Sequence, residues 1–487
     1  MLFNSYEFLF GFLPLVLGVF MLLSWRGQVR LAAAWLALGS VLFYGWWSPR
    51  YVLLLLASIT ANYWLGQTIA ARVQQGGARS ARRPLQAGIA VNLALLCYYK
   101  YANFFLDAAQ TLSGVPLPAF DVILPIGISF FTFTQIAFLV DCHEGKVRES
   151  DPVHYLLFVT YFPHLIAGPV LHHAEMMPQF ARRDTYRWDT RNVAIGATFF
   201  AMGLVKKVVL ADGIQPYVAP VFDQGVQPDL VTAWGGALAY TLQLYFDFSG
   251  YSDMAVGLSR MFNVQLPFNF DSPYRASNIS EFWRRWHMTL SRFLRDYLYI
   301  PLGGNRHGDL RRHVNLMTTM LLGGLWHGAG WTFVIWGGLH GLYLVVNHGW
   351  SAWAAHLGWR GPTWLTRPLA HALTLIAVVI AWVFFRAHTV DDALRVLRGM
   401  AGGNGLGDWN ATADFSRQWL TTAVLGAWAL FLPNSQQWVS RWFAGDSSAT
   451  GRRSMQWAVI GGTLMLATLL VVINGARGVS EFIYFNF

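Results

Sequence analysis

Long apolar runs without a charged side chain recur along this chain. Phe8–Leu23, Tyr51–Ala71 and Trp457–Ile473 contain no Asp, Glu, Lys or Arg, and only 12% of all residues are charged. A soluble domain carries about twice that charged fraction, and each run approaches the roughly 20 residues that a helix needs to cross a bilayer. Only helices and closed β-barrels span a bilayer. The runs lack the alternating apolar and polar residues of outer-membrane barrel strands, so we expect them to be helices. The sequence predicts an all-α polytopic membrane protein.

We expect about 11 or more transmembrane helices in a single integral-membrane domain over residues 1–487. Segment 153–170 contains Pro163, Gly168 and Pro169 and is predicted to be a broken or re-entrant element. Segment 314–347 is too long for one straight span, and its glycines indicate a bent or doubled one. Residues 402–405 and 434–455 are expected to be surface connections. The expected spans are 8–24, 31–47, 51–71, 86–106, 122–142, 192–211, 231–249, 314–347, 369–386, 418–433 and 456–474.

The formal net charge of +10 is explained by the connections between the spans and does not require nucleic acid as a partner. Alternate connections of the first half differ in charge. One set carries eight positive residues, and the other set carries Arg50 alone. The eight residues are Arg26, Arg30, Arg72, Arg79, Arg82, Arg83, Lys146 and Arg148. By the positive-inside rule, this places the N-terminus outside the cytoplasm. The first apolar segment has no basic residue before it and no small-residue cleavage site after it, so we expect a retained span and no signal peptide.

Several chemistries lack their usual residues. The sequence has no phosphate-binding Walker loop, no His-Glu-x-x-His helix and no Gly-x-Ser-x-Gly elbow. Cys97 and Cys142 have no metal-ligand spacing, and we expect both to be small buried hydrophobic residues. No metal is predicted.

The segment 278–300 differs from the spans. Asn278 and Glu281 have the spacing of a capping box, which starts a helix. An apolar face then follows at helical spacing, as does a polar stripe of Arg284, His287, Ser291 and Arg295. These features predict an amphipathic helix at the cytoplasmic interface or around a polar cavity. A turn at Tyr299–Asn305 is expected to lead into a basic loop, Arg306–His313.

His327 lies within the apolar, glycine-rich run 321–331. An ionisable side chain at membrane depth is costly and is therefore a candidate functional residue. On a helix, Gly323, Gly324 and Gly330 would leave a groove beside it for an acyl chain or a hydroxyl. The alternative is that the glycines permit close helix packing, as the Gly324–Gly328 spacing also indicates, and that His327 bonds a neighbouring carbonyl.

His287 is the second candidate. Its place on the polar stripe indicates a role facing a cavity, and cationic neighbours favour its neutral form, which accepts a proton; the alternative is a solvated surface histidine. Nearby arginines are expected to anchor the helix to anionic headgroups or to recognise phosphates of an acyl donor. Asp247 and Asp253 are expected to pair with those arginines.

Four further histidines lie in or beside apolar segments. His340 lies thirteen residues after His327, about 220° around a straight helix, so it points elsewhere unless the helix bends. His164, His172 and His173 flank the proline-broken segment and are expected to be loop residues that line a donor or acceptor entrance.

At these residues the chain resembles the membrane-bound O-acyltransferase (MBOAT) family, and specifically its bacterial alginate O-acetylase branch. The resemblance runs essentially end to end. The matching segments are Phe3–Ser5, Asp247–Asp253, Phe282–His287, Asp296–Asn305, Leu325–Gly328 and Phe482–Phe485.

The resemblance implies a bundle of tilted, re-entrant and interfacial helices around a central tunnel, in the bacterial inner membrane. His327 matches the essential histidine of the family, and His287 a second, less uniformly required position. The implied donor is acetyl-CoA or another acyl thioester from the cytoplasm, with an acyl carrier as one possible source. In this branch the acetyl group passes to periplasmic proteins that acetylate an exopolysaccharide. The other residues assigned to the substrate site are Trp286, Arg284, Ser291, Trp326, Gly323 and Gly324.

As a hypothesis, His327 takes the proton from the acceptor hydroxyl as that hydroxyl attacks the thioester, while His287, Trp286 or a backbone amide stabilises the oxyanion or holds the donor. Other readings stay open. The same fold could transfer D-alanine to teichoic acid or acylate a lipid headgroup. A transporter would use the histidines as a proton relay, and a structural subunit of an export complex would tolerate their replacement.

Overall fold

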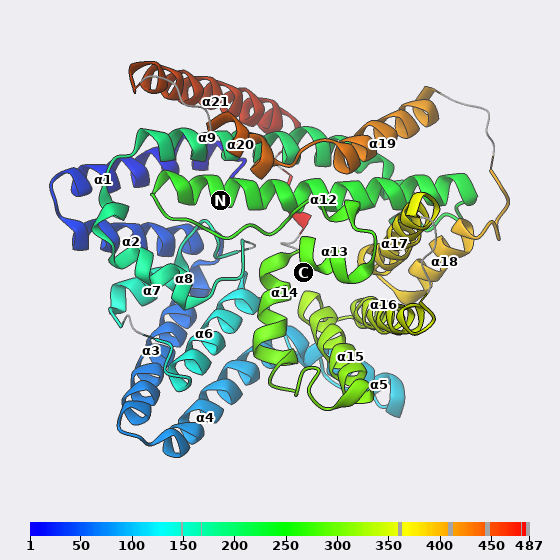
Figure 1. The fold of residues 1–487 in the computed structure, drawn as a ribbon, viewed down its shortest axis with the longest axis horizontal. Helices are drawn as coiled ribbons and strands as arrows, with labels where there is room; N and C mark the ends of the chain where they lie inside the picture. Colours follow the sequence, from blue (N-terminus) through cyan, green and yellow to red (C-terminus); the bar gives the residue numbers. More distant parts are fainter. Residues whose placement is uncertain are drawn as a thin grey trace. The chain divides into compact units, whose positions relative to one another are not determined.

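The computed structural model describes residues 1–147, 150–166, 168–358, 363–407, 413–443, 449–478 and 480–483. The structure is helical, and these residues contain no strand (Figure 1). Seven helical segments in this part of the chain are long and apolar enough to cross a membrane: Glu7–Trp25, Val29–Trp47, Pro49–Gln74, Ala78–Ser113, Thr190–Tyr217, Trp364–Arg386 and Met455–Gly475. The prediction of an all-α polytopic membrane protein is confirmed.

The chain divides into two compact units, each built from segments distant in sequence. The first comprises Met1–Leu204, Tyr251–Pro267 and Val439–Asn486, and the second Val205–Gly250, Phe268–Trp438 and Phe487.

The first unit consists of α-helices with short π- or 3₁₀-helices between them. They are η1 (Glu7–Phe12), α1 (Leu13–Trp25), α2 (Val29–Trp47), η2 (Pro49–Tyr51), α3 (Val52–Gln74), α4 (Ala78–Leu96), η3 (Cys97–Tyr101), α5 (Ala102–Ser113), α6 (Ile128–His143), α7 (Pro152–Thr160), α8 (His173–Ala181), η4 (Arg183–Tyr186), α9 (Thr190–Leu204) and α21 (Ala449–Arg477).

The second unit contains both candidate histidines. Its helices are η5 (Val205–Ala211), α10 (Asp212–Ile214), η6 (Gln215–Tyr217), α11 (Ala219–Phe222), η7 (Pro273–Arg275), α13 (Ile279–Arg285), α14 (Met288–Leu294), η8 (Arg295–Tyr299), α15 (Gly308–His327), α16 (Trp331–His356), α17 (Thr363–Arg386), α18 (Val390–Met400) and α19 (Ala413–Phe431). Helices α12 (Leu230–Met261) and α20 (Ser435–Phe443) belong to both units.

In the first unit the two ends of the chain meet in one buried cluster. The Tyr251 ring lies between Phe3 and Phe482, with centroid distances of 5.0 and 4.6 Å. Asn4 is buried, its side-chain amide donates to the Ser480 carbonyl (3.3 Å), and its own carbonyl accepts from Asn474 Nδ2 (3.1 Å). The N- and C-terminal segments that carry the family resemblance therefore share a structural role. Tyr484 and Phe485 lie outside the described residues.

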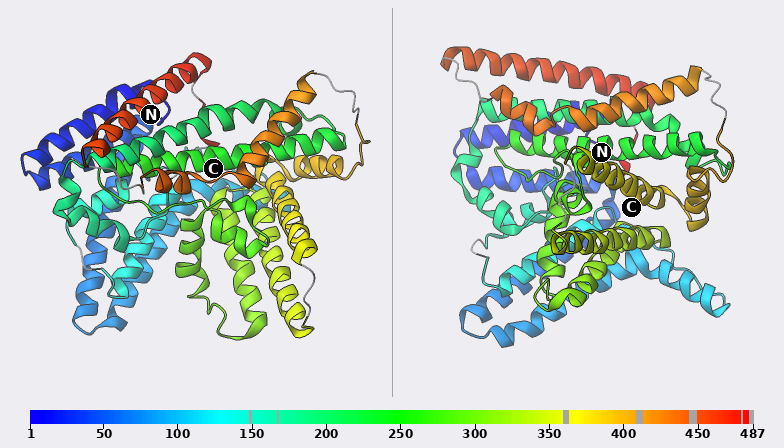
Figure 2. Two further views of the ribbon diagram at one scale, coloured as in Figure 1. Left: turned by 45° about the horizontal axis from the view of Figure 1, so that its top comes forward. Right: turned by 45° about the vertical axis from the view of Figure 1, so that its right-hand side comes forward.

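In the second unit, α15 and α16 form a close antiparallel hairpin (Figure 2). A Cβ on Gly324 would meet the Phe333 carbonyl and lie 3.0 Å from the Gly337 Cα, and a Cβ on Gly337 would meet the Met320 carbonyl. The glycines thus let two backbones touch. The prediction of a bent or doubled element at 314–347 is confirmed, since the chain breaks at Gly328–Gly330.

Several local expectations need correction. Residues 308–313 form the first turns of α15, so the basic loop is shorter than predicted. The stretch 434–455 contains α20 and the start of α21 and is not a plain surface connection. Cys142 is buried as expected, whereas Cys97 is exposed. Segment 153–170 is broken as predicted, because α7 ends at Thr160 and turns follow. Arg148, counted for orientation, lies outside the described residues.

Candidate active site

His327 is the last residue of α15, so the helix ends at the candidate histidine. Its ring is surrounded by aromatic rings of Trp326, Trp336 and Phe385, at centroid distances of 4.9, 5.0 and 5.2 Å and close to edge-on. The residue is 3% exposed. Trp336 comes from α16 and Phe385 from α17, so three helices fix the position of the imidazole.

The glycines beside His327 serve helix packing. Gly324 contacts the α16 backbone, and a Cβ on Gly323 would lie 3.2 Å from Leu294 Cδ1. A Cβ on Gly328 would meet the Phe333 ring. The groove predicted at Gly323 and Gly324 is therefore filled by protein, and the packing alternative accounts for these two residues.

His287 occupies the corner between α13 and α14, which corrects the predicted continuous helix over 278–300. The predicted helix start at Asn278 is confirmed, since Asn278 Oδ1 accepts from the Glu281 amide (2.8 Å). However, α13 ends at Arg285, and His287 has φ +43°, in the left-handed region. A non-glycine residue there costs about 1–3 kcal/mol. Arg284, His287, Ser291 and Arg295 consequently do not form one helical stripe.

Asn269 holds His287 in this conformation. Its Oδ1 accepts from Thr289 Oγ1 (2.5 Å) and lies 3.3 Å from His287 Nδ1, while its carbonyl accepts from the Met288 amide (2.9 Å). The Thr289 backbone amide also donates to this Asn269 atom (3.4 Å), which identifies it as the oxygen, so the tautomer that completes the contact carries its hydrogen on His287 Nδ1. Nε2 of His287 then bears the lone pair. Burial lowers the pKa of His287 to about 3, so the ring is neutral at ordinary pH.

The two candidate histidines lie together in the second unit. Their ring centroids are 6.3 Å apart, and the His287 ring is 6.1 Å from that of Trp326 and 4.8 Å from that of Phe248 on α12. His287 is fully buried, so the alternative of a solvated surface histidine is wrong. Two imidazoles 40 residues apart in sequence thus lie together in an apolar environment, where a neutral imidazole can accept a proton.

The other predicted substrate-site residues are distributed around this pair. Trp286 is buried and packs on Phe270 and Trp382, with centroid distances of 5.0 and 4.9 Å. Ser291 is half-buried, and its hydroxyl donates to the Trp286 carbonyl (3.4 Å). Arg284 is exposed. Trp326 contacts both histidines, and with Trp286 it supports the site by packing.

Asp247 of α12 has a lysine partner, where an arginine of the 278–300 segment was predicted. Asp247 forms a buried ion pair with Lys207 Nζ (2.8 Å), which also contacts Asp212 (2.9 Å). Arg285 instead contacts Glu281 and Asp271. The salt bridge of Lys207 joins η5 to α12.

His340 is close to the site, because the break after His327 reverses the chain. Its ring is 4.9 Å from that of Trp336, which also contacts His327, and its Nδ1 accepts from Trp283 Nε1 (3.3 Å). His327 and His340 therefore lie on two different helices, and the angle expected for a straight helix does not separate them. Asn269, Trp336 and Phe385 were not predicted from the sequence. The glycine break at 328–330 is the one local signal that bears on them, since it returns Trp336 toward His327.

His164 and His172 are loop residues as predicted, whereas His173 is the first residue of α8. His164 is buried, and its Nε2 lies 3.0 Å from the Phe158 carbonyl. His173 is buried at the start of α8, and its Nδ1 lies 2.7 Å from Asp141 Oδ2. Both have structural partners inside the first unit. Within the described ranges, no group of three His, Cys, Asp or Glu side chains is arranged to hold a metal ion.

Comparison with known proteins adds to this geometry. Residues 86–387, which contain both histidines, match the sequence profile of the membrane-bound O-acyltransferase family. A peptidoglycan O-acetyltransferase of Helicobacter pylori is 42% identical over 433 residues, covering 83% of this chain and 81% of the relative. A probable alginate O-acetylase of Pseudomonas aeruginosa is 42% identical over 435 residues, covering 88% and 80%. A teichoic acid D-alanyltransferase of Bacillus subtilis is 25% identical over 283 residues, covering 55% and 68%.

The family profile spans more than half of the chain. The two acetylase relatives are each 42% identical to this chain, and each alignment covers at least 80% of both sequences. The predicted resemblance is therefore confirmed: the chain belongs to the membrane-bound O-acyltransferase family and is a membrane acyltransferase.

Proposed function

We propose that this protein transfers an acetyl group from a cytoplasmic thioester to a hydroxyl, in the bacterial inner membrane, for O-acetylation of an exopolysaccharide. The observation that carries the proposal is the pair of buried imidazoles, His327 and His287, with ring centroids 6.3 Å apart. The two relatives at 42% identity are named for different polymers but for the same acetyl group. Their names therefore favour acetyl over D-alanyl.

His327 is proposed as the general base. It takes the proton from the acceptor hydroxyl, whose oxygen attacks the thioester carbonyl carbon; the C–S bond then breaks, and the thiolate leaves with the proton held by the imidazolium. General base catalysis by a placed side chain contributes about 10²–10⁴-fold. The edge-on rings of Trp336 and Phe385 hold the imidazole in place.

His287 receives a different role from the oxyanion contact considered for it above. With its Nδ1 hydrogen directed at Asn269 Oδ1, the neutral ring has no second hydrogen to donate. Its Nε2 lone pair suits it to accept a hydrogen bond from the acceptor hydroxyl or from a pantetheine amide. We therefore assign His287 to substrate positioning.

The donor is proposed to be acetyl-CoA or a carrier-bound thioester. The Arg284 side chain is exposed and has no ion pair or hydrogen bond within the described part of the chain, so its guanidinium is available to a phosphate of such a donor. Periplasmic acetyltransferase or acceptor proteins are proposed to receive the group, and the whole chain, residues 1–487, to act as one O-acyltransferase domain.

The test is reconstitution of the purified protein into vesicles with acetyl-CoA labelled in the acetyl group. We expect release of coenzyme A and labelled ester that both depend on an added hydroxyl acceptor. Uptake of label without thioester cleavage would instead identify a transporter. Mass analysis of the native polymer identifies its acceptor and distinguishes acetyl from D-alanyl esters.

A further inference from the structure

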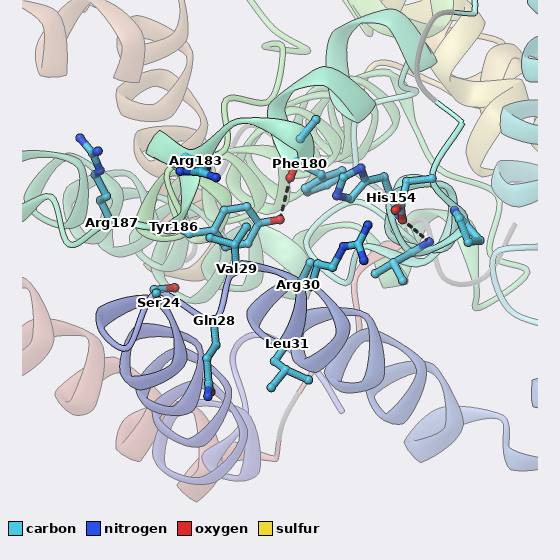
Figure 3. A pocket seen from close by; sticks show the side chains of 16 residues that line it. Ser24, Gln28, Val29, Arg30, Leu31, His154, Phe180, Arg183, Tyr186 and Arg187 are labelled. Atoms are coloured by element: carbon cyan, nitrogen blue, oxygen red, sulfur yellow. Dashed lines mark hydrogen bonds between the residues drawn. The ribbon is translucent and has the colours of Figure 1, made fainter.

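A large cavity lies in the first unit, outside the site described above. It has a volume of about 1040 Å³ and is lined by the turn between α1 and α2, the start of α7, the end of α8, and η4 (Figure 3). Pockets that bind drug-sized organic molecules have volumes of up to about 1,000 Å³. The cavity therefore has room for a phosphorylated headgroup and the first part of its chains.

Three arginines line this cavity from separate parts of the sequence. Arg30 rises from the start of α2, while Arg183 and Arg187 come from η4 and the residue after it (Figure 3). Arg187 forms an exposed pair with Asp184 (3.2 Å). The side chains of Arg30 and Arg183 have no hydrogen bond or ion pair among the residues described. Two exposed guanidinium groups are thus available to an anion.

The carboxylate that lines the cavity is engaged with the backbone. Asp151 caps α7, and its Oδ1 accepts from the Val153 and His154 amides (2.8 and 3.3 Å). The formal charge of the lining, three arginines against one carboxylate, is +2 with neutral histidine. The start of α2 also borders the cavity, and no side chain caps it, so its dipole favours an anion.

The remaining lining is largely apolar. Val29, Leu31 and Phe180 contribute side chains, and the Tyr186 hydroxyl donates to the Phe180 carbonyl (2.8 Å), which fixes the ring in the wall (Figure 3). A basic rim beside an apolar wall is complementary to an amphiphile more than to a free nucleotide. The ligand expected from this lining has one or two phosphates and a hydrocarbon part.

The cavity lies where two candidate membrane helices end. α1 and α2 are both among the helices long and apolar enough to cross a bilayer, and the turn between them forms the cavity edge. Arginines at this level face lipid headgroups, and guanidinium forks match phosphate oxygens. We propose that this pocket is a specific binding site for the phosphate of an anionic phospholipid, with Arg30 and Arg183 as its principal ligands.

The test uses the full-length protein in an uncharged detergent and native mass spectrometry. Short-chain phosphatidylglycerol and phosphatidylcholine with matched acyl chains are titrated, with inorganic phosphate and glycerol phosphate as soluble competitors. The pocket variant is Arg30→Gln/Arg183→Gln. The control is Arg26→Gln/Arg182→Gln, which removes the same charge from the same two segments but from side chains that do not line the cavity. All four side chains are exposed, and unfolding temperatures without lipid check that each variant folds.

We expect wild type and control to bind phosphatidylglycerol at least about tenfold more tightly than phosphatidylcholine, and the pocket variant to lose that preference. Equal binding of the two lipids by wild type would overturn the proposal, as would equal losses in both variants. Displacement of the lipid by millimolar glycerol phosphate or inorganic phosphate would overturn the lipid assignment in favour of a soluble phosphate. The experiment measures lipid binding alone, so a result that overturns the lipid site has no bearing on the acetyl-transfer proposal.

Discussion

At the scale of single residues, the site depends on how one asparagine orients one histidine. Asn269 uses its backbone and its side chain together to hold the α13–α14 corner, where His287 has a left-handed backbone conformation. Strain of this kind persists only where surrounding contacts impose it. The contacts of Asn269 are therefore expected to matter for activity, although this residue is not proposed to touch the reacting atoms.

Replacement of Asn269 by Ala should lower turnover and destabilise the protein by about 1–3 kcal/mol, because the Thr289 hydroxyl and His287 Nδ1 lose their acceptor. The matched control is Asn315→Ala, which removes another buried asparagine of the second unit, bonded to the Gly304 carbonyl (3.0 Å). Thermal unfolding and acetyl transfer per folded molecule are measured for both. Equal losses of transfer in the two variants would contradict a positioning role for Asn269.

The buried state of His287 predicts a pH dependence of stability. Its pKa is lowered from 6.5 to about 3, so the unfolded chain binds a proton over this window and the folded chain does not. Stability contributed by this residue is complete above pH 6.5 and is lost as the pH falls toward 3. The variant His287→Gln should lose less stability than wild type over this window. Identical pH profiles of the unfolding temperature would contradict the burial of the neutral ring.

At the scale of elements, the hairpin of α15 and α16 determines where His327 and His340 lie. The chain reverses at Gly328–Gly330, and the glycine contact between Gly324 and Gly337 keeps the two helices close. Trp336 then contacts both histidines. The packing of this hairpin should therefore be coupled to the activity of the site.

The variant Gly324→Ala should separate the hairpin, lower the unfolding temperature and reduce transfer, because its Cβ would meet the rigid Phe333 carbonyl. Gly338→Ala, on α16, is the matched control: its Cβ would lie 3.6 Å from Leu321 Cδ2, an ordinary contact. Alanine replacing a helical glycine otherwise gains about 0.5–1 kcal/mol. Wild-type stability and transfer in Gly324→Ala would show that the close helix contact is not required.

At the scale of the whole molecule, the sequence predicted the features that depend on local patterns of apolar, capping and glycine residues. Apolar run length predicted the helices, the Asn278 cap was right, and the glycines of 314–347 marked the break. The corner at His287 was missed because the stripe of Arg284, His287, Ser291 and Arg295 fits a helix equally well. The partner of Asp247 was missed because Lys207 lies 40 residues earlier in an apolar span, and no local pattern joins them.

Orientation in the membrane is also a property of the whole molecule. The arginine distribution predicts a periplasmic N-terminus, with the turn at Gln28 in the cytoplasm and the end of α5 at Ser113 in the periplasm. Both residues are exposed. In a Cys97→Ser/Cys142→Ser background, Ser113→Cys should react with an impermeant maleimide in spheroplasts, and Gln28→Cys only after lysis. The reverse labelling pattern would invert the orientation.

The most direct test of the account is acetyl transfer by His327→Asn in reconstituted vesicles, beside His356→Asn, which changes an exposed histidine at the end of α16. Loss of the general base in His327→Asn should reduce thioester-dependent ester formation by about 10²–10⁴-fold. The control His356→Asn should keep both the unfolding temperature and the activity of wild type. Transfer by folded His327→Asn at the wild-type rate would contradict the central claim that this imidazole accepts the proton.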